Sequence, residues 1–437
     1  MSSPTWSVYE GGSDDSFEKN KNNNGGSSRN GLPPERSLRG CGLRQKALLQ
    51  RGAQGAVYLA EDADGNTFAV KRLFTQRSDF GVRGISEGAL REAALLSLIA
   101  RRAAELDLEG DFGVVRLHGV VEAPFHELCL ILEMCPLDIS RVFIRKRKRS
   151  QGICRLNSEL PPRCPILAKM NLIQYLMRGI LKVVLCLHER CHIVHRDLKP
   201  GNLLIGANGQ VRLADFGSAR LMHDDAATST PDSTCGEYTP TAIRTTVIYQ
   251  SPECILGERA YTTTADMWAV GVLFAEMLLQ QHLFTSRSEL AVLSEIWKLL
   301  GTPSDDTPSS PSSMPPAAVT PSTGESALTY AVRTEPTIAL KFPETIVNAE
   351  GLDLLKAMLT LTPGTRITAA DALRHPFLSS DAAKSGDAEA RLLWQEKVRA
   401  CAQEAARPVA VGMQSLFRAG DESDSGGEDD GNRMCVF

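Results

Sequence analysis

A short polar loop in the middle of the chain, His195 to Asn202 with the sequence HRDLKPGN, carries the groups that acid–base and metal chemistry need. It holds a carboxylate at Asp197, an ammonium at Lys199 and an amide at Asn202, and branched aliphatic residues flank it on both sides. A carboxylate can accept a proton, and amide and carboxylate oxygens bind hard cations. The aliphatic flanks therefore predict a loop that is anchored in a core so that its polar groups converge on one substrate.

Five further features accompany this loop in a fixed order along the chain. They are a glycine-containing turn before Val57, the lysine of AVK at Lys71, a glutamate at Glu92, DFG at 215–217 and SPE at 251–253. Together they resemble the signature of protein kinases, in which positioning and charge neutralisation drive phosphoryl transfer from ATP. A single HRD or DFG tripeptide would carry little weight, whereas the ordered set indicates a catalytically competent kinase.

The resemblance assigns a task to each charged group near the phosphates. Lys71 is expected to hold the α and β phosphates of ATP, and Glu92 is expected to orient Lys71 through an ion pair. Asn202 and Asp215 are expected to bind Mg2+, which bridges the phosphates. These four residues are therefore predicted to form the nucleotide and metal end of the site.

The acceptor end of the predicted site lies in the opening loop. Asp197 is expected to accept the proton of the substrate hydroxyl, and Lys199 is expected to neutralise the γ phosphate, as in serine/threonine kinases. Two structural roles also follow from the resemblance. Glu253 and Arg366 are expected to form a buried ion pair, and Asp266 is expected to accept hydrogen bonds from the backbone of the loop.

The glycine-rich turn departs from the family pattern, because the register set by Val57 places Gln50, Gly52 and Gly55 at the three glycine positions. Two glycines still allow backbone amides to approach phosphate. Ala53 and Gln54 stand where many relatives carry an inhibitory Thr-Tyr pair. The resemblance implies an ATP pocket in which Leu132 is the gatekeeper and the backbones of Glu133 and Cys135 bind adenine. The residues expected to form this pocket are Leu49, Gln50, Arg51, Gly52, Ala53, Gln54, Gly55, Ala56, Val57, Ala69, Lys71, Leu132, Glu133, Cys135, Asp138 and Leu204.

At GISEGALREAALL the resemblance narrows to the cyclin-dependent kinases, whose PSTAIRE motif would occupy Ser86 to Glu92. The likeness continues through LILEMCPLDI, DFGSAR, SPECILG, TADMWAVGVLFAEM, LGTP and TPGTRITAADALRHPFL, within residues 43–378. It implies a serine/threonine kinase that acts on protein substrates and is activated by a cyclin-like subunit docking on this helix. Gln250 replaces an arginine that helps shape a proline-preferring pocket, so proline-directed specificity stays open. The alternatives are a catalytically silent scaffold and a CMGC kinase that needs no cyclin.

Three arginines at motif positions, Arg91, Arg196 and Arg220, predict a phosphate-binding cluster. In the family, such arginines converge on a phosphothreonine of the activation loop, and the usual spacing back from SPE reaches Thr241. A phosphate with a charge of about −1.5 to −2 could hold guanidiniums from three elements in one arrangement. The length of this loop leaves alternative sites at Thr239, Thr245 and Thr246.

The predicted fold is α+β and bilobal, with a small N-terminal lobe of antiparallel sheet plus one helix and a larger, mainly helical C-terminal lobe. We expect the kinase domain at 43–378, with the N-lobe at 43–134 and the C-lobe at 137–378, and we expect the packed body to close at Leu378. The other expected segments are a disordered extension at 1–42, a flexible Pro/Ser-rich insertion at 303–323, and an extension at 379–437 with a helix at 388–406 and an acidic disordered tail.

Hydrophobic periodicity predicts the main elements. The runs AVYLAED and NTFAVKRLF, separated by DADGN, predict a β-hairpin. In the helix expected over 85–106, Leu90, Ala94 and Leu98 recur every four residues and are expected to form the apolar face. Two strongly apolar stretches, 169–190 and 264–279, predict buried helices.

Composition limits the partners. The 437 residues carry a net charge of −4, so nothing in the overall charge favours nucleic acid. No apolar run is judged to approach the ~20 residues of a membrane span and no signal peptide is recognised, so we expect no membrane partner and a nuclear or cytoplasmic location. The eleven cysteines fit a reducing compartment, and the crowded Cys and His of 186–195 match no standard zinc spacing. The basic run 145–149 is interpreted as a solvated insertion, with nuclear import as the alternative.

Overall fold

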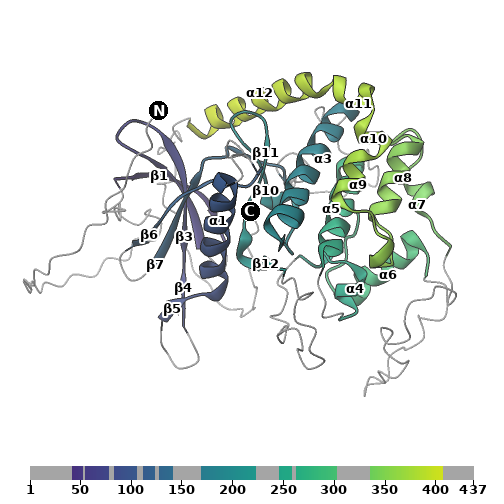
Figure 1. Cartoon of the computed structure of the whole chain (residues 1–437), viewed down its shortest axis with the longest axis horizontal. Coiled ribbons are helices and arrows are strands. Elements are labelled where there is room, and N and C mark those ends of the chain that lie inside the picture. The colour runs from purple at the N-terminus through teal and green to yellow at the C-terminus, as the bar shows by residue number, and fades with distance from the viewer. Residues whose placement is uncertain are drawn as a thin grey trace, which may run out of the picture.

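The described residues of the computed structural model form two lobes, with a β-sheet and α1 in one and most helices in the other (Figure 1). The two-lobed α+β architecture expected from the sequence is confirmed. The predicted insertion, the basic run, most of the N-terminal extension and the acidic tail lie outside the described residues, which are 42–52, 55–77, 83–105, 112–123, 127–140, 169–222, 246–257, 262–302 and 335–406.

An antiparallel five-stranded sheet in the order β1-β2-β3-β7-β6 forms the N-lobe. β2 and β3 are the predicted hairpin, and the Asp62 side chain closes the turn by accepting hydrogen bonds from the N–H groups of Asp64 (3.0 Å) and Asn66 (2.8 Å). A short ribbon, β4-β5, leads from the sheet to α1. The strands are β1 (Arg44–Arg51), β2 (Gly55–Glu61), β3 (Thr67–Leu73), β4 (Thr75–Arg77), β5 (Arg83–Ile85), β6 (Leu117–Ala123) and β7 (Glu127–Glu133).

Helix α1 (Glu87–Glu105) begins after Ser86, whose hydroxyl accepts a hydrogen bond from the Ala89 N–H at 3.3 Å. The helix is present as predicted, but the expected apolar face is wrong at two of its three residues. Leu90 is 52% exposed and Ala94 is also exposed, whereas Leu98 packs against the core. The buried face includes a charged residue, Glu92, which hydrophobicity alone would assign to the surface. The buried side chains are Ala89, Glu92, Leu95, Leu96, Ile99 and Ala103.

Helices α3 (Met170–Leu185) and α5 (Thr263–Leu279) form the centre of the C-lobe, as their apolar sequences predict. Every residue of α5 from Ala265 to Leu278 is buried. A π-helical turn, Cys186–Cys191, extends α3.

With this turn, α3 is long and apolar enough, by length and composition only, to span a membrane, and it is the one such helix among the described residues. The expectation that no run approaches this size is therefore wrong. Some 56% of its most apolar window is buried, and α3 packs against α5, α9 and β11. This packing accounts for its apolar character.

Polar caps begin several of the shorter helices around this centre. Ser288 precedes α6, Asn348 precedes α8 and Thr368 precedes α9, and each side chain accepts a hydrogen bond from a backbone N–H of the first turn. The remaining elements of the lobe are β8 (Leu137–Asp138), β9 (Ile193–Val194), β10 (Leu203–Ile205), β11 (Val211–Leu213), β12 (Arg220–Leu221), α4 (Pro252–Ile255), α6 (Glu289–Leu300), α7 (Ile338–Lys341), α8 (Ala349–Met358), α9 (Ala369–Arg374), α10 (Pro376–Ser379) and α11 (Asp381–Ser385).

Helix α12 (Asp387–Ala406) coincides closely with the helix predicted at 388–406. Its residues Ala390, Trp394 and Val398, spaced four apart, are at most 3% exposed and belong to the main hydrophobic core. The packed body therefore continues past Leu378, and the expectation that it closes there is wrong. Figure 1 shows α12 running along one edge of the molecule, where it packs against α3 and β8.

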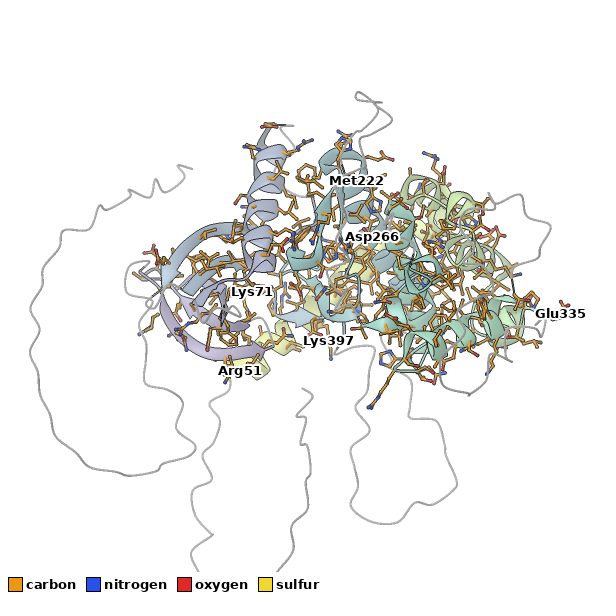
Figure 2. The ribbon with its side chains drawn as sticks, turned by 90° about the horizontal axis from the view of Figure 1, so that it is seen from below. Arg51, Lys71, Met222, Asp266, Glu335 and Lys397 are labelled. Carbon is orange, nitrogen blue, oxygen red and sulfur yellow. The ribbon has the colours of Figure 1, made fainter. Side chains whose placement is uncertain are left out.

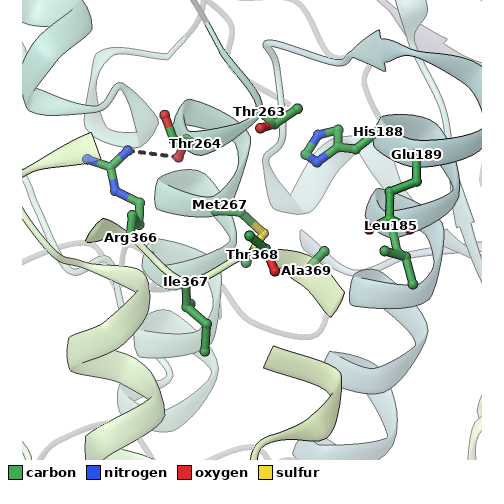
Figure 3. A pocket seen from close by; sticks show the side chains of 10 residues that line it. All are labelled: Leu185, His188, Glu189, Thr263, Thr264, Met267, Arg366, Ile367, Thr368 and Ala369. Atoms are coloured by element: carbon green, nitrogen blue, oxygen red, sulfur yellow. Dashed lines mark hydrogen bonds between the residues drawn. The ribbon is translucent and has the colours of Figure 1, made fainter. Parts of the chain in front are cut away.

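The predicted buried ion pair between Glu253 and Arg366 is present in the C-lobe. Arg366 Nη1 lies 2.7 Å from Glu253 Oε1, and Nη2 lies 3.0 Å from Oε2. The Arg366 side chain is fully buried and also donates to the carbonyl oxygen of Thr264 at 2.7 Å (Figure 3) and to that of Thr360 at 3.0 Å. Because these bonds replace hydration, loss of one partner would strand a charge in the core.

We expect Arg366→Leu to lower the free energy of unfolding by about 3–5 kcal/mol, because the Glu253 carboxylate would remain buried without its counter-ion. Urea denaturation followed by circular dichroism measures this loss. Arg374→Leu is the matched control, since its ion pair with Asp371 is exposed to solvent and is expected to contribute little. Equal losses in the two variants would contradict the assignment of Arg366 as a core anchor.

Candidate active site

The polar loop predicted to do chemistry is held between buried strands. β9 leads into it, a 3-10 turn at Pro200–Asn202 forms its second half, and β10 leads out of it. The flanking side chains of Ile193 and Ile205 are fully buried. The loop is therefore anchored at both ends, as its aliphatic flanks predict.

The carboxylate of Asp266, on α5 inside the C-lobe (Figure 2), fixes the backbone of the loop. Its Oδ2 accepts the N–H of His195 at 2.8 Å, and its Oδ1 accepts the N–H of Arg196 at 2.9 Å. His188 Nε2 lies 2.9 Å from the same carboxylate. Burial alone would raise the pKa of Asp266, but these hydrogen bonds outweigh it and lower the pKa, so the group is an anion that binds the loop.

Arg196 is held in an unfavourable backbone conformation by its hydrogen bond to Asp266. Its φ is 68°, in the left-handed region, which costs a non-glycine residue about 1–3 kcal/mol. The bond from its N–H to Asp266 holds the residue in this conformation, directly before Asp197. The predicted role of Asp266 as acceptor for the loop backbone is therefore present.

Asp197 is enclosed by a cation and an amide. Lys199 Nζ lies 2.7 Å from Asp197 Oδ2, and Asn202 Nδ2 donates to the same oxygen at 3.1 Å and to the Asp197 carbonyl at 2.7 Å. Burial raises the pKa of Asp197, while Lys199 opposes this rise. A carboxylate with a raised pKa is a better proton acceptor than an ordinary exposed one, which suits a general base.

Charged groups from three elements meet at Lys71, which lies on β3 in the N-lobe (Figure 2). Its Nζ lies 2.7 and 2.8 Å from the two carboxylate oxygens of Glu92 on α1 and 3.0 Å from Asp215 Oδ1. Burial opposes the charge of Lys71, but the two carboxylates outweigh burial and raise its pKa. Burial would raise the pKa of Asp215, but Lys71 outweighs it and lowers that pKa. The expected Lys71–Glu92 ion pair is present, and Asp215 joins it.

Direct contacts connect this cluster to the loop. The Ala214 N–H donates to the Asn202 carbonyl at 2.9 Å, and His195 Nε2 lies 3.2 Å from the Ala214 carbonyl. The fully buried ring of Phe216 packs edge-on against His195, with 4.9 Å between the ring centroids. Asp215, between Ala214 and Phe216, is therefore held in a fixed relation to Asp197.

Asn202 and Asp215 fit the magnesium ligation that the sequence predicts. Because Asn202 Nδ2 is bonded to Asp197, Oδ1 is the atom that this amide can offer to a cation. The Asp215 side chain is 34% exposed and has a second oxygen beside the one that accepts from Lys71. Both are hard oxygen ligands, which Mg2+ takes together with phosphate oxygens.

The sheet register brings the predicted walls of the ATP pocket onto one face of the N-lobe. Val57 pairs with Lys71, and Ala69 pairs with Leu132. Residues that are paired, or two apart on one strand, share a face of a sheet, so these four side chains face the same way. In the C-lobe, β10 pairs with β8, which places Leu204 opposite Asp138.

The segment that joins the lobes contains an ion pair that the sequence analysis missed. The Glu133 carboxylate lies 3.1 Å from Arg212 Nε on β11, and no local pattern links two positions so far apart in the chain. The Glu133 N–H donates to the Arg116 carbonyl at 2.8 Å, so the carbonyl is the group that Glu133 can offer to adenine. At Cys135, burial and the neighbouring Glu133 raise the thiol pKa to about 12.

The two glycines of the turn between β1 and β2 have different surroundings. The Gly52 N–H closes the turn by donating to the Gly55 carbonyl at 2.9 Å. A Cβ on Gly55 would lie 2.3 Å from the Arg72 carbonyl on β3, whereas a Cβ on Gly52 would meet no atom within 4 Å. Sheet packing thus requires a glycine at position 55, whereas position 52 has room for a larger side chain.

Of the other predicted residues in this turn and its strands, Ala56 is buried, Leu49 is half-buried, Gln50 and Arg51 are exposed, and Ala53 and Gln54 lie outside the described residues.

Two of the three predicted phosphate-binding arginines lie against one short turn. Arg91 Nη1 donates to the Gly217 carbonyl at 2.8 Å, and Arg220 Nη1 donates to carbonyls of the next two residues at 3.3 and 2.9 Å. Arg196, the third, is buried in the loop before Asp197. The predicted site Thr241 and the alternatives Thr239 and Thr245 lie outside the described residues, and Thr246 is exposed.

A separate pocket opens in the C-lobe between the end of α3, the first turn of α5 and residues 366–369 (Figure 3). None of the predicted catalytic, metal or nucleotide residues lines it. His188 and Arg366 in its wall make the structural bonds described above. The residues predicted to do chemistry lie away from this pocket, around Lys71, Asp197 and Asp215.

Comparison with known proteins agrees with this geometry. The family model described as "Protein kinase domain" matches residues 43–378. A protein of Xenopus laevis named cyclin-dependent kinase 4 is 32% identical over 335 residues, which cover 76% of this chain and 88% of that protein. Helix α12 lies beyond the matched residues.

We expect Gly55→Ala to destabilise the N-lobe by about 1–3 kcal/mol, because its Cβ would collide with the β3 backbone. Gly52→Ala is the matched variant in the same turn and is expected to leave stability close to that of the natural protein, because its Cβ would enter open space. Thermal unfolding of the two variants measures the difference. Equal melting temperatures would show that the β3 backbone can shift to accept the new Cβ without loss of stability.

Proposed function

Since the chain belongs to the protein kinase family and is related to the cyclin-dependent kinases, we propose that it is a serine/threonine kinase under the control of a cyclin-type partner. As a protein kinase, it transfers the γ phosphate of ATP to protein hydroxyls with Mg2+. The observation that carries the proposal is the convergence of Lys71, Asp215 and Asp197. Lys71 binds Asp215 directly, and Ala214, next to Asp215, contacts Asn202 and His195 in the loop that carries Asp197. The charges of Lys71, Asp215 and Asp197 suit phosphate binding, metal binding and proton acceptance, respectively.

The side chains divide the work of transfer. Lys71, oriented by Glu92, binds phosphate oxygens, and the ion pair restricts the ammonium to one position. Asn202 and Asp215 supply protein oxygens for Mg2+, which neutralises phosphate charge when bound. Asp197 accepts the proton as the hydroxyl attacks, and its burial raises its affinity for that proton.

Lys199 supports serine or threonine as the acceptor residue. Its ammonium lies 2.7 Å from the Asp197 carboxylate, so a cation stands beside the proton acceptor. A fixed cation at this point stabilises negative charge that develops on the transferring phosphoryl group. The family resemblance places such a lysine in serine/threonine kinases.

Helix α1 supports a regulatory partner of the cyclin type. It carries Glu92, and through Arg91 it contacts the carbonyl of Gly217 in the turn after Asp215, so a protein that moves α1 also moves catalytic groups. Leu90, directly before Arg91, is 52% exposed. A single exposed leucine is ordinary on a protein surface, and what suits Leu90 to a regulatory partner is its place on the helix that makes both contacts.

A threonine phosphorylated in the activation loop, Thr241 in the register of the sequence, is proposed as a second control. Arg91 and Arg220 already lie against one turn, and Arg196 precedes the catalytic aspartate. A phosphate bound by these guanidiniums would tie the loop to both α1 and the catalytic loop.

A kinase that needs no cyclin is the alternative to this control. In that case the contact between Lys71 and Glu92, which is 2.7 Å, would form without a partner. The two possibilities differ in the activity of the isolated chain. High activity of the isolated chain would contradict cyclin control and support this alternative.

We expect Asp197→Asn to lower kcat by about 10²- to 10⁴-fold, because an amide cannot take the hydroxyl proton. The purified chain, alone and with candidate cyclins, is given labelled ATP, Mg2+ and a protein substrate. Nucleotide affinity is expected to change little, since Lys71 and Asp215 keep their contacts. Asp381→Asn, an exposed aspartate of α11, is the control. Equal transfer by the natural protein and Asp197→Asn would defeat the role of Asp197 as proton acceptor. Absence of Mg2+-dependent transfer by the natural protein would favour a silent scaffold.

We expect Leu90→Asp to abolish stimulation by a cyclin-type partner while leaving the melting temperature unchanged, because the side chain is exposed in the free chain. Burying a leucine at an interface contributes about 1.5–3 kcal/mol, and a charge there would oppose binding. Leu290→Asp, which alters a leucine that is 68% exposed on α6, is the matched control. Unchanged stimulation of Leu90→Asp would remove α1 as the docking element.

A further inference from the structure

Helix α12 lies outside the residues that match the kinase family, yet its contacts lead to the predicted nucleotide pocket. Its buried side chains Ala390, Trp394 and Val398 fix the helix against the core. It packs on α3 and on β8, the strand that carries Asp138. Apolar packing thus fixes the position of the helix independently of its polar contacts.

Two donors from α12 hold one backbone carbonyl. Arg391 Nε and Gln395 Nε2 both donate to the Asn208 carbonyl, at 3.1 and 3.0 Å. The next residue, Gly209, has φ of 78°, and a Cβ there would lie 2.8 Å from the Arg391 carbonyl. From the other side, the Tyr175 hydroxyl of α3 donates to the Gly209 carbonyl at 3.1 Å. The turn at 208–209 is therefore clamped between α12 and α3.

This turn joins β10 to β11, and the hairpin carries the predicted nucleotide residue Leu204 and pairs with the strand of Asp138. Leu204 on β10 pairs with Arg212 on β11 on one side and with Asp138 on β8 on the other. These strands have only two or three residues each. Side chains of β10 and β11 are buried in the core, but such short strands contribute few ladder bonds, so the bonds that hold the turn add to what fixes the hairpin.

A side-chain path also runs from the clamped turn to the segment between the lobes. Asn208 Nδ2 donates to Gln210 Oε1 at 2.8 Å, and Arg212 Nη1 donates to the same oxygen at 3.4 Å. Arg212 Nε then binds the Glu133 carboxylate at 3.1 Å. The clamp is thus connected to the backbone proposed for adenine as well as to Leu204 and Asp138.

We propose that Arg391 and Gln395 are positioning residues for ATP: by clamping the turn at 208–209, α12 holds β10 and β8 in the geometry that receives the adenosine part of the nucleotide. The inference rests on the proposed kinase function, since it assigns ATP to this pocket. It predicts that α12 controls nucleotide affinity without taking part in phosphoryl transfer.

The sharpest test is Gln395→Glu in the full chain, because this nearly isosteric change replaces the donor by a carboxylate that repels the Asn208 carbonyl. Arg391→Ala removes the second donor. Loss of one hydrogen bond corresponds to about a 2- to 10-fold change in an equilibrium constant. We therefore expect the Kd of a fluorescent ADP analogue and the KM for ATP each to rise about 2- to 10-fold, with kcat unchanged.

Two exposed residues of the same helix provide matched controls: Arg399→Ala and Glu396→Gln. Both are expected to bind the analogue like the natural protein. Hydrogen exchange supplies a readout that needs no nucleotide, since the Gly206 N–H bonds to the Gln210 carbonyl at 2.9 Å within the hairpin and should exchange faster in Gln395→Glu and Arg391→Ala.

Three results would overturn the inference: nucleotide affinity in the two clamp variants equal to that of the controls, a fall in kcat at constant KM for ATP, or unchanged exchange in the hairpin. A natural protein that binds the analogue but transfers no phosphate defeats the proposed function and leaves this test intact. A natural protein that binds no nucleotide defeats both.

Discussion

The buried carboxylate of Asp266 is the constraint on which the active site depends. It stands on a helix that is enclosed along almost its whole length, so it cannot move without disturbing the core. In these surroundings its hydrogen bonds to His195 and Arg196 are strong and directional. They hold Arg196 in an unfavourable backbone conformation and so fix the position of Asp197. The apolar packing of the C-lobe thus fixes the position of the proposed proton acceptor.

The other catalytic charges are shared between the lobes. Lys71 and Glu92 belong to the N-lobe, whereas Asp197 and Asn202 belong to the C-lobe. Asp215 binds Lys71, and its neighbour Ala214 donates to the Asn202 carbonyl, so this segment connects the two groups. Because α1 carries Glu92 and touches the turn after Asp215, the position of α1 decides whether Lys71 and Asp215 are held next to each other. The proposed control through this helix, by a partner or by phosphate, rests on that division.

Local patterns predicted the hairpin of β2 and β3 and the apolar helices, and the family resemblance supplied the Lys71–Glu92 and Glu253–Arg366 pairs. Where the resemblance gave no guidance, prediction failed at positions that a distant partner decides. The buried face of α1 was misassigned because Glu92 turns inward to meet Lys71, which makes a charge part of the core. The Glu133–Arg212 pair and the packing of α12 were missed for the same reason, since both depend on strands and turns far away in the chain. The roles given to Thr241 and to the residues of the glycine turn at 53–54 stay predictions.

Cys135 shows how burial also sets the reactivity of the site. With a pKa of about 12, only roughly one thiol in 10⁴ to 10⁵ is ionised at neutral pH, and the thiolate is the nucleophilic form. An electrophilic compound seated against the segment between the lobes would therefore meet a sulfur that attacks slowly. Covalent capture at this position would be limited by deprotonation of the thiol.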